Sequence, residues 1–197
     1  MSKNMFSFGV KELKLYQITK PDTEGKLPEY GEELPVGSTN AVKLTYDTAN
    51  AKAYGDDAVV ADISAVTGAK LEWAGWDAPQ STKAHIYGHK FADGTLDEST
   101  DDAAPYIGAS YIRTLRNDSA GVVYEAVAVY KAQAVKADED NQTKSNNLNL
   151  GTTPINMNVV ETLAGKLVSR KQFEDSAEAP ALTAARTWLA GLFKQGA

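Results

Sequence analysis

The sequence contains no cysteine, which excludes disulfide bonds and thiolate metal sites. It also has no apolar run near the roughly 20 residues that cross a bilayer. Residues 1–8 lack the basic start and apolar stretch of a secretory signal peptide. We therefore expect a protein that makes no membrane contact, stays in the cytoplasm until it assembles, and is stabilised by burial and by contacts with other chains.

Residues that carry chemistry are scarce. His85 and His89 are the only histidines, and their spacing would place both on one face of a helix. The zinc protease signature needs Glu directly after the first histidine, where this sequence has Ile86. A Gly-rich phosphate loop, a Gly-x-Ser-x-Gly elbow and a dinucleotide fingerprint are also missing. We expect no enzyme, no catalytic residue, no cofactor and no metal; a metal hydrolase that uses both histidines is the enzyme alternative.

Positive charge is in the minority, since 20 Lys and Arg residues stand against 26 Asp and Glu, for a formal net charge of −6. One stretch concentrates acidic residues without any Lys or Arg: Asp93, Asp97, Glu98, Asp101 and Asp102. Stable DNA binding draws much of its affinity from Lys and Arg that displace counterions, so we expect this chain to repel nucleic acid. The stretch lacks the alternating acidic positions and closing Glu of an EF-hand, and solvated loops are the simpler interpretation.

Length and composition predict one domain over residues 1–197, because 197 residues with 43% hydrophobic content can build one sizeable core. Apolar residues predict strands over 10–18, 42–46, 59–63, 69–73, 155–159 and 163–168. Residues 1–9 are expected to form an N-terminal arm. Residues 20–40 hold three prolines and three glycines and predict a long loop, of the kind that is functional or ordered by a partner.

Two helices are predicted. Asp77 suits an N-cap, Pro79 a first turn and Gly88 a left-handed end, so a short helix is expected there. A second helix is predicted over residues 180–194, because apolar residues recur at helical spacing. Its stripe consists of Leu182, Ala185, Trp188, Leu189, Leu192 and Phe193. We expect this amphipathic helix to pack on the strands of a mainly β protein.

The longest strand-like runs, 106–115 and 122–133, predict a β-hairpin whose turn includes Asn117, Asp118, Ser119 and Gly121. One face of the second arm carries Val123, Val127 and Val129. The other face carries Tyr124, Ala126, Ala128, Tyr130 and Ala132. Both faces are apolar, whereas a strand with one face in water alternates apolar with polar residues. We therefore expect both faces to be covered, by the chain itself or by a partner.

Several segments resemble the major tail (tail tube) proteins of long-tailed, non-contractile bacteriophages, the siphoviruses. They are Phe-Gly-Val at 8–10, Ala-Tyr-Gly-Asp-Asp at 53–57, Gly-Ala-Lys-Leu-Glu-Trp at 68–73, Ala-Pro-Tyr-Ile-Gly at 104–108, Val-Tyr-Glu-Ala-Val at 123–127 and Ala-Ala-Arg-Thr-Trp at 184–188. The resemblance covers most of the chain, while residues 142–172 depart from the family pattern.

The resemblance implies a β-sandwich or half-barrel subunit whose strands join those of its neighbours into a ring barrel. Six subunits would form a ring, and stacked rings would form a tube that conducts DNA during genome ejection. The implied partners are the chain itself, the tape measure and other tail proteins, with DNA passing without specific binding. The implied location is the virion tail, assembled in the host cytoplasm.

The residues that we expect at assembly contacts or at a net acidic or neutral lumen come from the hairpin and from the acidic stretch. They are Tyr124, Ala126, Ala128, Tyr130, Asp93, Asp97, Glu98, Asp101 and Asp102. Closure into a ring would also protect long strand edges from uncontrolled aggregation. A β-sandwich binding module of the carbohydrate-binding or adhesin type is the main alternative, because Trp73, Trp76, Tyr106 and Tyr111 would suit it.

Overall fold

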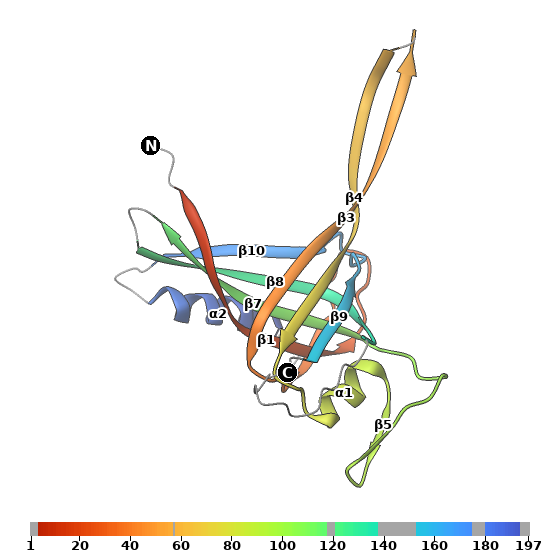
Figure 1. The fold of residues 1–197 in the computed structure, drawn as a ribbon, viewed down its shortest axis with the longest axis vertical. Helices are drawn as coiled ribbons and strands as arrows, with labels where there is room; N and C mark the ends of the chain where they lie inside the picture. The colour runs from red at the N-terminus through yellow and green to blue at the C-terminus, as the bar shows by residue number, and fades with distance from the viewer. Residues whose placement is uncertain (1–3, 57, 118–120, 138–152, 175–179, 194–197) are drawn as a thin grey trace, which may run out of the picture.

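The computed structural model describes residues 4–56, 58–117, 121–137, 153–174 and 180–193. These residues form a mainly β protein with a large antiparallel sheet and two helices (Figure 1). The elements are β1 (Met5–Lys20), β2 (Glu29–Leu34), β3 (Thr39–Gly55), β4 (Ala58–Gly75), α1 (Gln80–Tyr87), β5 (Lys90–Ala92), β6 (Thr95–Asp97), β7 (Tyr106–Asn117), β8 (Gly121–Val135), β9 (Thr153–Val159), β10 (Val168–Phe173) and α2 (Ala181–Phe193).

The sheet has the strand order β2-β1-β7-β8-β9-β4-β3, and β10 also pairs with β8. The edge of β8 is shared, because its first half pairs with β10 and its last residues pair with β9. The sheet curls so far that the start of β3 approaches β1. Thr39 Oγ1 accepts hydrogen bonds from Trp73 Nε1 at 3.1 Å and from the Leu13 amide at 3.4 Å. This shared acceptor fastens the two flanks of the curl together.

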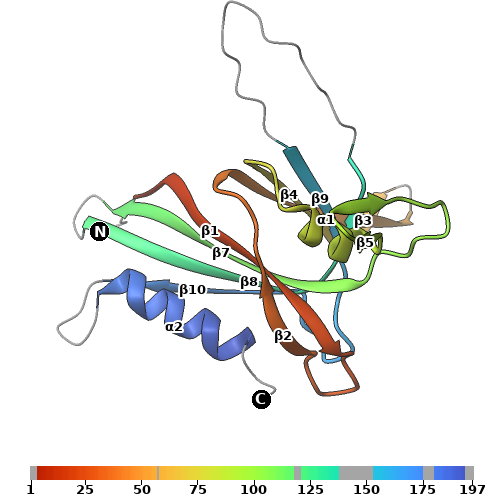
Figure 2. The same ribbon diagram turned by 90° about the horizontal axis from the view of Figure 1, so that it is seen from below.

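Each face of the sheet packs on its own core. Figure 2 shows α2 lying along β8 and β10 on one of these faces. The core inside the curl includes Trp73 and Leu71 and receives Ile86 from α1. The opposite face is covered by α2, whose apolar stripe packs on β8. The two hydrophobic faces of β8 are thus both covered within one chain. The predicted hairpin and the predicted C-terminal helix are confirmed.

The core beneath α2 is organised by an aromatic stack at the end of the helix. Phe193 stacks on Tyr16 with ring centroids 4.3 Å apart and meets Tyr30 edge-on at 4.7 Å. Gly108 of β7 lies under these rings, and a Cβ there would come within 2.6 Å of Tyr30. The glycine therefore makes room for the rings that hold α2 on the sheet.

A β-bulge in β8 changes which residues share a face. Ala132 pairs with Ile107 and Val129 pairs with Ala109, so Tyr130 and the residue after it stand opposite one residue of β7. Ala132 consequently joins the core inside the curl. Its assignment to the face of Tyr124 is wrong, because strict alternation does not hold across an inserted residue.

The prediction of one long loop over residues 20–40 is wrong, since β2 occupies its centre and pairs with β1. Pro28 and Pro35 directly flank this strand. Tyr30 is only 3% exposed and donates a hydrogen bond to the Tyr130 carbonyl at 2.8 Å. Burial of this aromatic ring and pairing with β1 outweigh the local turn signals.

Other boundaries differ more modestly. The strands predicted at 59–63 and 69–73 are parts of β4, β1 begins within the predicted N-terminal arm, and β10 starts where the segment 163–168 was expected to end. Helix α1 ends at a left-handed Gly88 as predicted, but its N-cap is Pro79. Asp77 instead forms an ion pair with Lys83 at 2.8 Å. The predicted turn residues Asp118 and Ser119 and the helix-end Lys194 lie outside the described residues.

Candidate functional site

The expected assembly face of β8 lies inside the subunit. Ala126 and Ala128 are 0% exposed and pack under Ala185 and Leu189 of α2. The prediction that these two alanines line a lumen or meet a neighbouring subunit is therefore corrected. The physical reason is that α2 covers this apolar face and removes it from water, whereas the sequence alone did not show which element would cover it.

The two tyrosines of that face are also engaged by the chain itself. Tyr130 is buried, and its hydroxyl donates to Ser169 Oγ at 2.8 Å. Tyr124 is half-buried and packs against the core beneath α2. Of the four hairpin residues singled out in the sequence, only Tyr124 keeps partial access to the surface.

The acidic stretch is partly folded. β5 and β6 form a small hairpin whose turn residues, Asp93 and Gly94, both have positive φ, at 51° and 77°. This pair of left-handed residues matches the type I′ turns that favour Asp-Gly. Asp93, Asp97 and Asp101 are exposed. These three carboxylates stay available at the surface as the charge pattern predicted.

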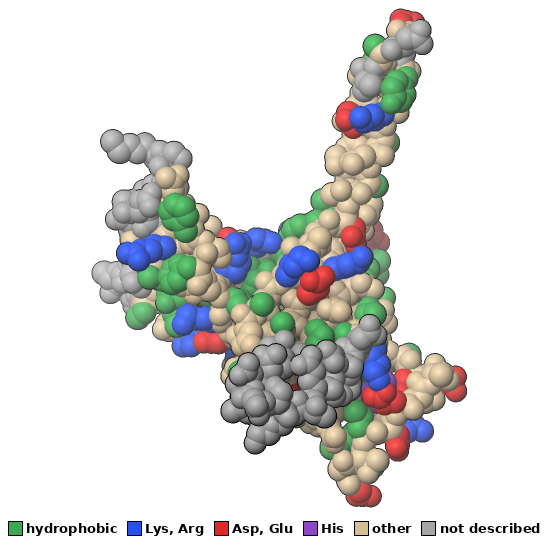
Figure 3. Space-filling model, viewed as in Figure 1, with side chains coloured by type: hydrophobic (Ala, Val, Ile, Leu, Met, Phe, Trp, Pro, Cys, Tyr) green, Lys and Arg blue, Asp and Glu red, His purple; other side chains and the backbone are tan. Residues whose placement is uncertain are grey.

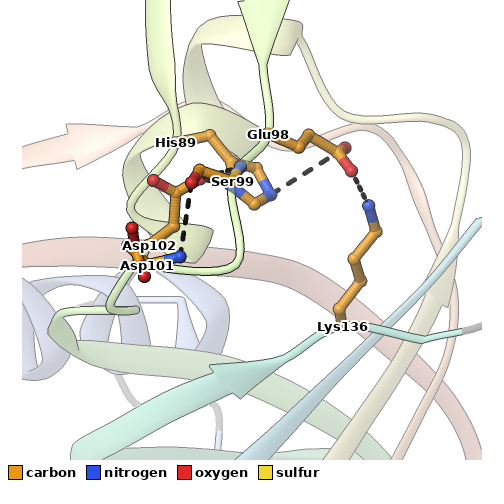
Figure 4. Close-up of polar contacts among 6 residues, drawn as sticks. All are labelled: His89, Glu98, Ser99, Asp101, Asp102 and Lys136. Carbon is orange, nitrogen blue, oxygen red and sulfur yellow. Dashed lines mark hydrogen bonds and ion pairs between the residues drawn. The ribbon is translucent and has the colours of Figure 1, made fainter.

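The other two carboxylates of the stretch flank His89 (Figure 4). Asp102 Oδ2 lies 2.7 Å from His89 Nδ1 and accepts a hydrogen bond from the Ser99 amide at 2.8 Å. Glu98 lies 3.8 Å from His89 Nε2 on the other side of the ring and pairs with Lys136. The Ser99 amide and then His89 lower the pKa of Asp102, and the hydrogen bond from Lys136 lowers the pKa of Glu98.

These contacts join the acidic loop to the end of α1 and to the end of β8, so Glu98 and Asp102 serve as local anchors. The two histidines do not share a helix face, because α1 ends at Tyr87 and His89 follows the left-handed Gly88. Among the residues that the structure describes, no group of three or more Asp, Glu or His side chains is arranged to hold a metal ion. His85 and His89 therefore do not form the pair on one helix face that the hydrolase alternative assumed.

The most exposed apolar surface was missed by sequence reasoning. The distal halves of β3 and β4 leave the body as a hairpin over residues 48–56 and 58–66, which stands clear of the other elements (Figures 1 and 3). Directly paired residues share a face of such a hairpin. One face, named here the alanine face, consists of the pairs Ala49 with Ala65, Ala51 with Ile63, and Ala53 with Ala61. Alanine at every second position was the available signal.

The base of the projecting hairpin is tied to the sheet by a charged network. Glu125 of β8 is buried and pairs with Arg113 at 2.8 Å and with Arg170 at 3.5 Å. Arg170 also donates to the Tyr46 hydroxyl of β3 at 3.1 Å. One carboxylate thus pairs with two guanidinium groups beside the hairpin.

Most Lys and Arg side chains among the described residues have a carboxylate within 4 Å. Figure 3 shows blue and red side chains interspersed on the viewed face. Local pairing leaves little continuous positive charge for a phosphate backbone to follow. In the described residues, no helix is both long and apolar enough to cross a bilayer.

No protein-family model matches this sequence, and no curated protein matches it. The features of this chain that bear on its function are the covered faces of β8, the local ion pairs and the projecting hairpin with its alanine face.

Proposed function

We propose that this protein is the structural subunit of a phage tail tube, which assembles with its own copies into stacked hexameric rings and conducts DNA during genome ejection. The observation that carries the proposal is that the curled sheet does not close into a barrel within the described residues of one chain. Its body is covered on both faces, while its flanks keep strand edges that no described element pairs. Such edges bind further strands, and closure into a ring protects them.

The two flanks lie on different strands. On one flank, β2 pairs only with Leu15 to Lys20 of β1, which leaves residues 5–12 of β1 without a strand on that side among the described residues. On the other flank, β3 is the last strand. Because the two edges differ, a repeated contact between copies is head-to-tail, and such contacts generate rings when the rotation closes.

The electrostatics support a conduit that does not retain DNA. The net charge is −6, and the positive side chains of the described surface are largely paired with carboxylates. A lumen that bound several phosphates per ring would hold DNA at moderate salt. We propose a net acidic or neutral lumen, with Asp93, Asp97 and Asp101 at a ring edge or at the lumen.

Negative-stain microscopy and sedimentation of the concentrated full-length chain test this function. Six-fold rings or tubes are the expected result. A chain that stays monomeric at every concentration up to its solubility limit and after prolonged incubation would overturn it. Retention of the assembled protein on immobilised duplex DNA at about 0.15 M salt would contradict the non-binding lumen.

A further inference from the structure

The alanine face of the projecting hairpin lies on the side of the β3–β4 pair that carries charged residues in the body. In the body, Leu44 of β3 and Leu71 of β4 oppose each other and face the core. Outside them, the ion pairs Lys43 with Glu72 and Lys70 with Asp47 face solvent. The strands then continue into residues 48–56 and 58–66 without a supporting core.

Alternation along β3 decides which face is which. β3 gains no extra residue at the register shift after Asp47, because the additional residue belongs to β4. Positions in phase with Leu44 therefore continue as Asn50 and Lys52, which are polar, and then as Tyr54, which is 71% exposed. Positions in phase with Lys43 continue as Ala49, Ala51 and Ala53. The alanine face thus lies on the side that is charged in the body, and the subunit's own core cannot cover it.

The alanine face is strongly exposed to solvent although its side chains are apolar. Ile63, at the centre of the alanine face, is 62% exposed. The face carries no charged side chain, whereas the opposite face holds the Lys52–Asp62 ion pair. An isolated two-stranded hairpin is marginally stable in water. An uncharged surface of small side chains on such a hairpin fits a permanent neighbour.

A second exposed apolar surface lies on the opposite flank. Met5, Phe6 and Phe8 of β1 are 39%, 57% and 59% exposed and are named here the aromatic edge. In Figure 1, this end of β1 and the projecting hairpin extend toward the same side of the body, and Figure 2 keeps them on opposite flanks. A lateral repeat of the subunit therefore brings the hairpin of one copy beside the aromatic edge of the next.

The two surfaces also fit in length. The aromatic edge, over residues 5–8 of β1, spans about 13 Å and fits along the roughly 20 Å of residues 48–53 of β3, at the usual rise of a strand. Small alanine side chains leave space for large aromatic rings, and neither surface carries a net charge that must be desolvated.

We propose that the alanine face of one copy packs against the aromatic edge of the adjacent copy and thereby joins neighbouring subunits. This inference rests on the proposed assembly function and adds the surfaces that carry it. The occupant of the alanine face is a second copy of this chain, contacting through Met5, Phe6 and Phe8.

The absence of cysteine allows a direct test by disulfide cross-linking. Full-length Ala51→Cys and Phe8→Cys chains are mixed at assembling concentration, oxidised mildly, and separated on a non-reducing gel. A disulfide between positions 51 and 8, identified by mass spectrometry, is the expected product. Asn50→Cys lies on the opposite face of the same strand and serves as the matched control, with a yield expected to be several-fold lower.

The other outcomes decide against the proposal. A 51–51 dimer as the main product would replace the head-to-tail contact with a symmetric one. Equal yields from positions 50 and 51 would show that the alanine face has no special role. Failure of both variants to cross-link to position 8, under conditions where the unmodified chain forms rings, would overturn the contact and leave the assembly function standing.

A second measurement uses charge instead of cross-linking. Ala51→Lys should leave the circular dichroism spectrum unchanged and weaken assembly by at least about tenfold, because the ammonium group must be desolvated at the contact. Asn50→Lys adds the same charge to the opposite face and should assemble within about threefold of the unmodified chain. Normal assembly of Ala51→Lys would refute only the role of the alanine face as a contact. An unmodified chain that never assembles would refute the proposed function itself.

Discussion

The body and the projecting half of the β3–β4 pair are built from the same two strands, yet different contacts stabilise them. In the body, Leu71 and Trp73 are fully buried, and ion pairs line the solvent side. In the projection, the alanines and Ile63 lie on the side that is charged in the body, whereas Tyr54 and Val66 stay in phase with Leu44. Alternation therefore identifies a strand and its two faces, but what covers each face is a property of the whole assembly.

The same contrast separates two alanine-rich strands. Ala126 and Ala128 of β8 are covered by α2, whereas Ala49, Ala51 and Ala53 of β3 have no covering element among the described residues. Small residues on β8 let a helix approach closely. On the hairpin, they keep a surface flat and uncharged. Substitutions in matched pairs, one in the body and one in the hairpin, separate folding from assembly.

The largest expected effect comes from a buried charge. Ala128→Lys places an ammonium group beneath α2 and should lower the free energy of unfolding by about 3 to 5 kcal/mol, because no carboxylate is available to pair with it there. Ala51→Lys should change the same quantity by less than about 0.5 kcal/mol. Urea unfolding of dilute protein measures both. Comparable losses from the two variants would mean that the hairpin belongs to the cooperative core.

Cavity creation should give the next largest effect. Leu71→Ala removes a fully buried side chain from the core inside the curl, so we expect a loss of about 2 to 4 kcal/mol in unfolding free energy. Ile63→Ala truncates the exposed centre of the alanine face and should leave the dilute monomer unaffected while weakening assembly. The comparison fails if Ile63→Ala lowers the urea midpoint as far as Leu71→Ala does.

The sequence predicted the elements with long and regular patterns. The β7–β8 hairpin and α2 have many apolar residues at a single period, and neither depends on a distant partner for its recognition. β2 was missed because Pro28 and Pro35 resemble loop signals, and only the pairing with β1 decides its structure. Ala132 was placed on the wrong face because a bulge depends on the partner strand and leaves no pattern in its own strand.

The candidate site was predicted less well for a related reason. The apolar face of β8 was correctly expected to need a cover, but an intramolecular helix and a neighbouring subunit present the same chemistry to Ala126 and Ala128. The local roles of Glu98 and Asp102 depend on His89 and Lys136, and the loop approaches Lys136 only through the fold. The alanine face escaped notice because alanine suits buried and exposed positions equally.

Overpacking should give a smaller loss than cavity creation. Gly108→Ala forces a methyl group against Tyr30 and Phe193, so the ring stack must shift, at a cost of about 2 kcal/mol. Gly68→Ala, at the base of the projecting hairpin, meets its nearest atom at 3.7 Å and should cost less than about 1 kcal/mol. Thermal unfolding followed by tyrosine fluorescence reports both changes. Equal losses would contradict the tight packing assigned to Gly108.

Among the substitutions in the body, the smallest change in unfolding free energy is expected at a buried ion pair. Asp22 is 5% exposed and accepts hydrogen bonds from Lys131 Nζ at 2.7 Å and from the Leu163 amide at 2.6 Å. Burial alone would raise the pKa of Asp22, but the hydrogen bonds to its carboxylate and the charge of Lys131 together outweigh burial and hold the pKa below its ordinary value. Asp22→Asn should therefore lower the unfolding free energy by about 1.5 kcal/mol near neutral pH.

The pH dependence of that loss provides the sharper measurement. A carboxylate whose pKa is lower in the folded protein stabilises it above the unfolded pKa of about 3.9, and this stabilisation disappears as the pH falls through the folded value. The difference between Asp22→Asn and the unmodified chain should accordingly shrink from about pH 4 downward. On the hairpin, the exposed Lys52–Asp62 pair spans 3.8 Å, and Asp62→Asn should change stability by less than about 0.5 kcal/mol at any pH. A constant difference for Asp22→Asn down to about pH 2 would show that its contribution comes from packing, because protonation would then remove nothing.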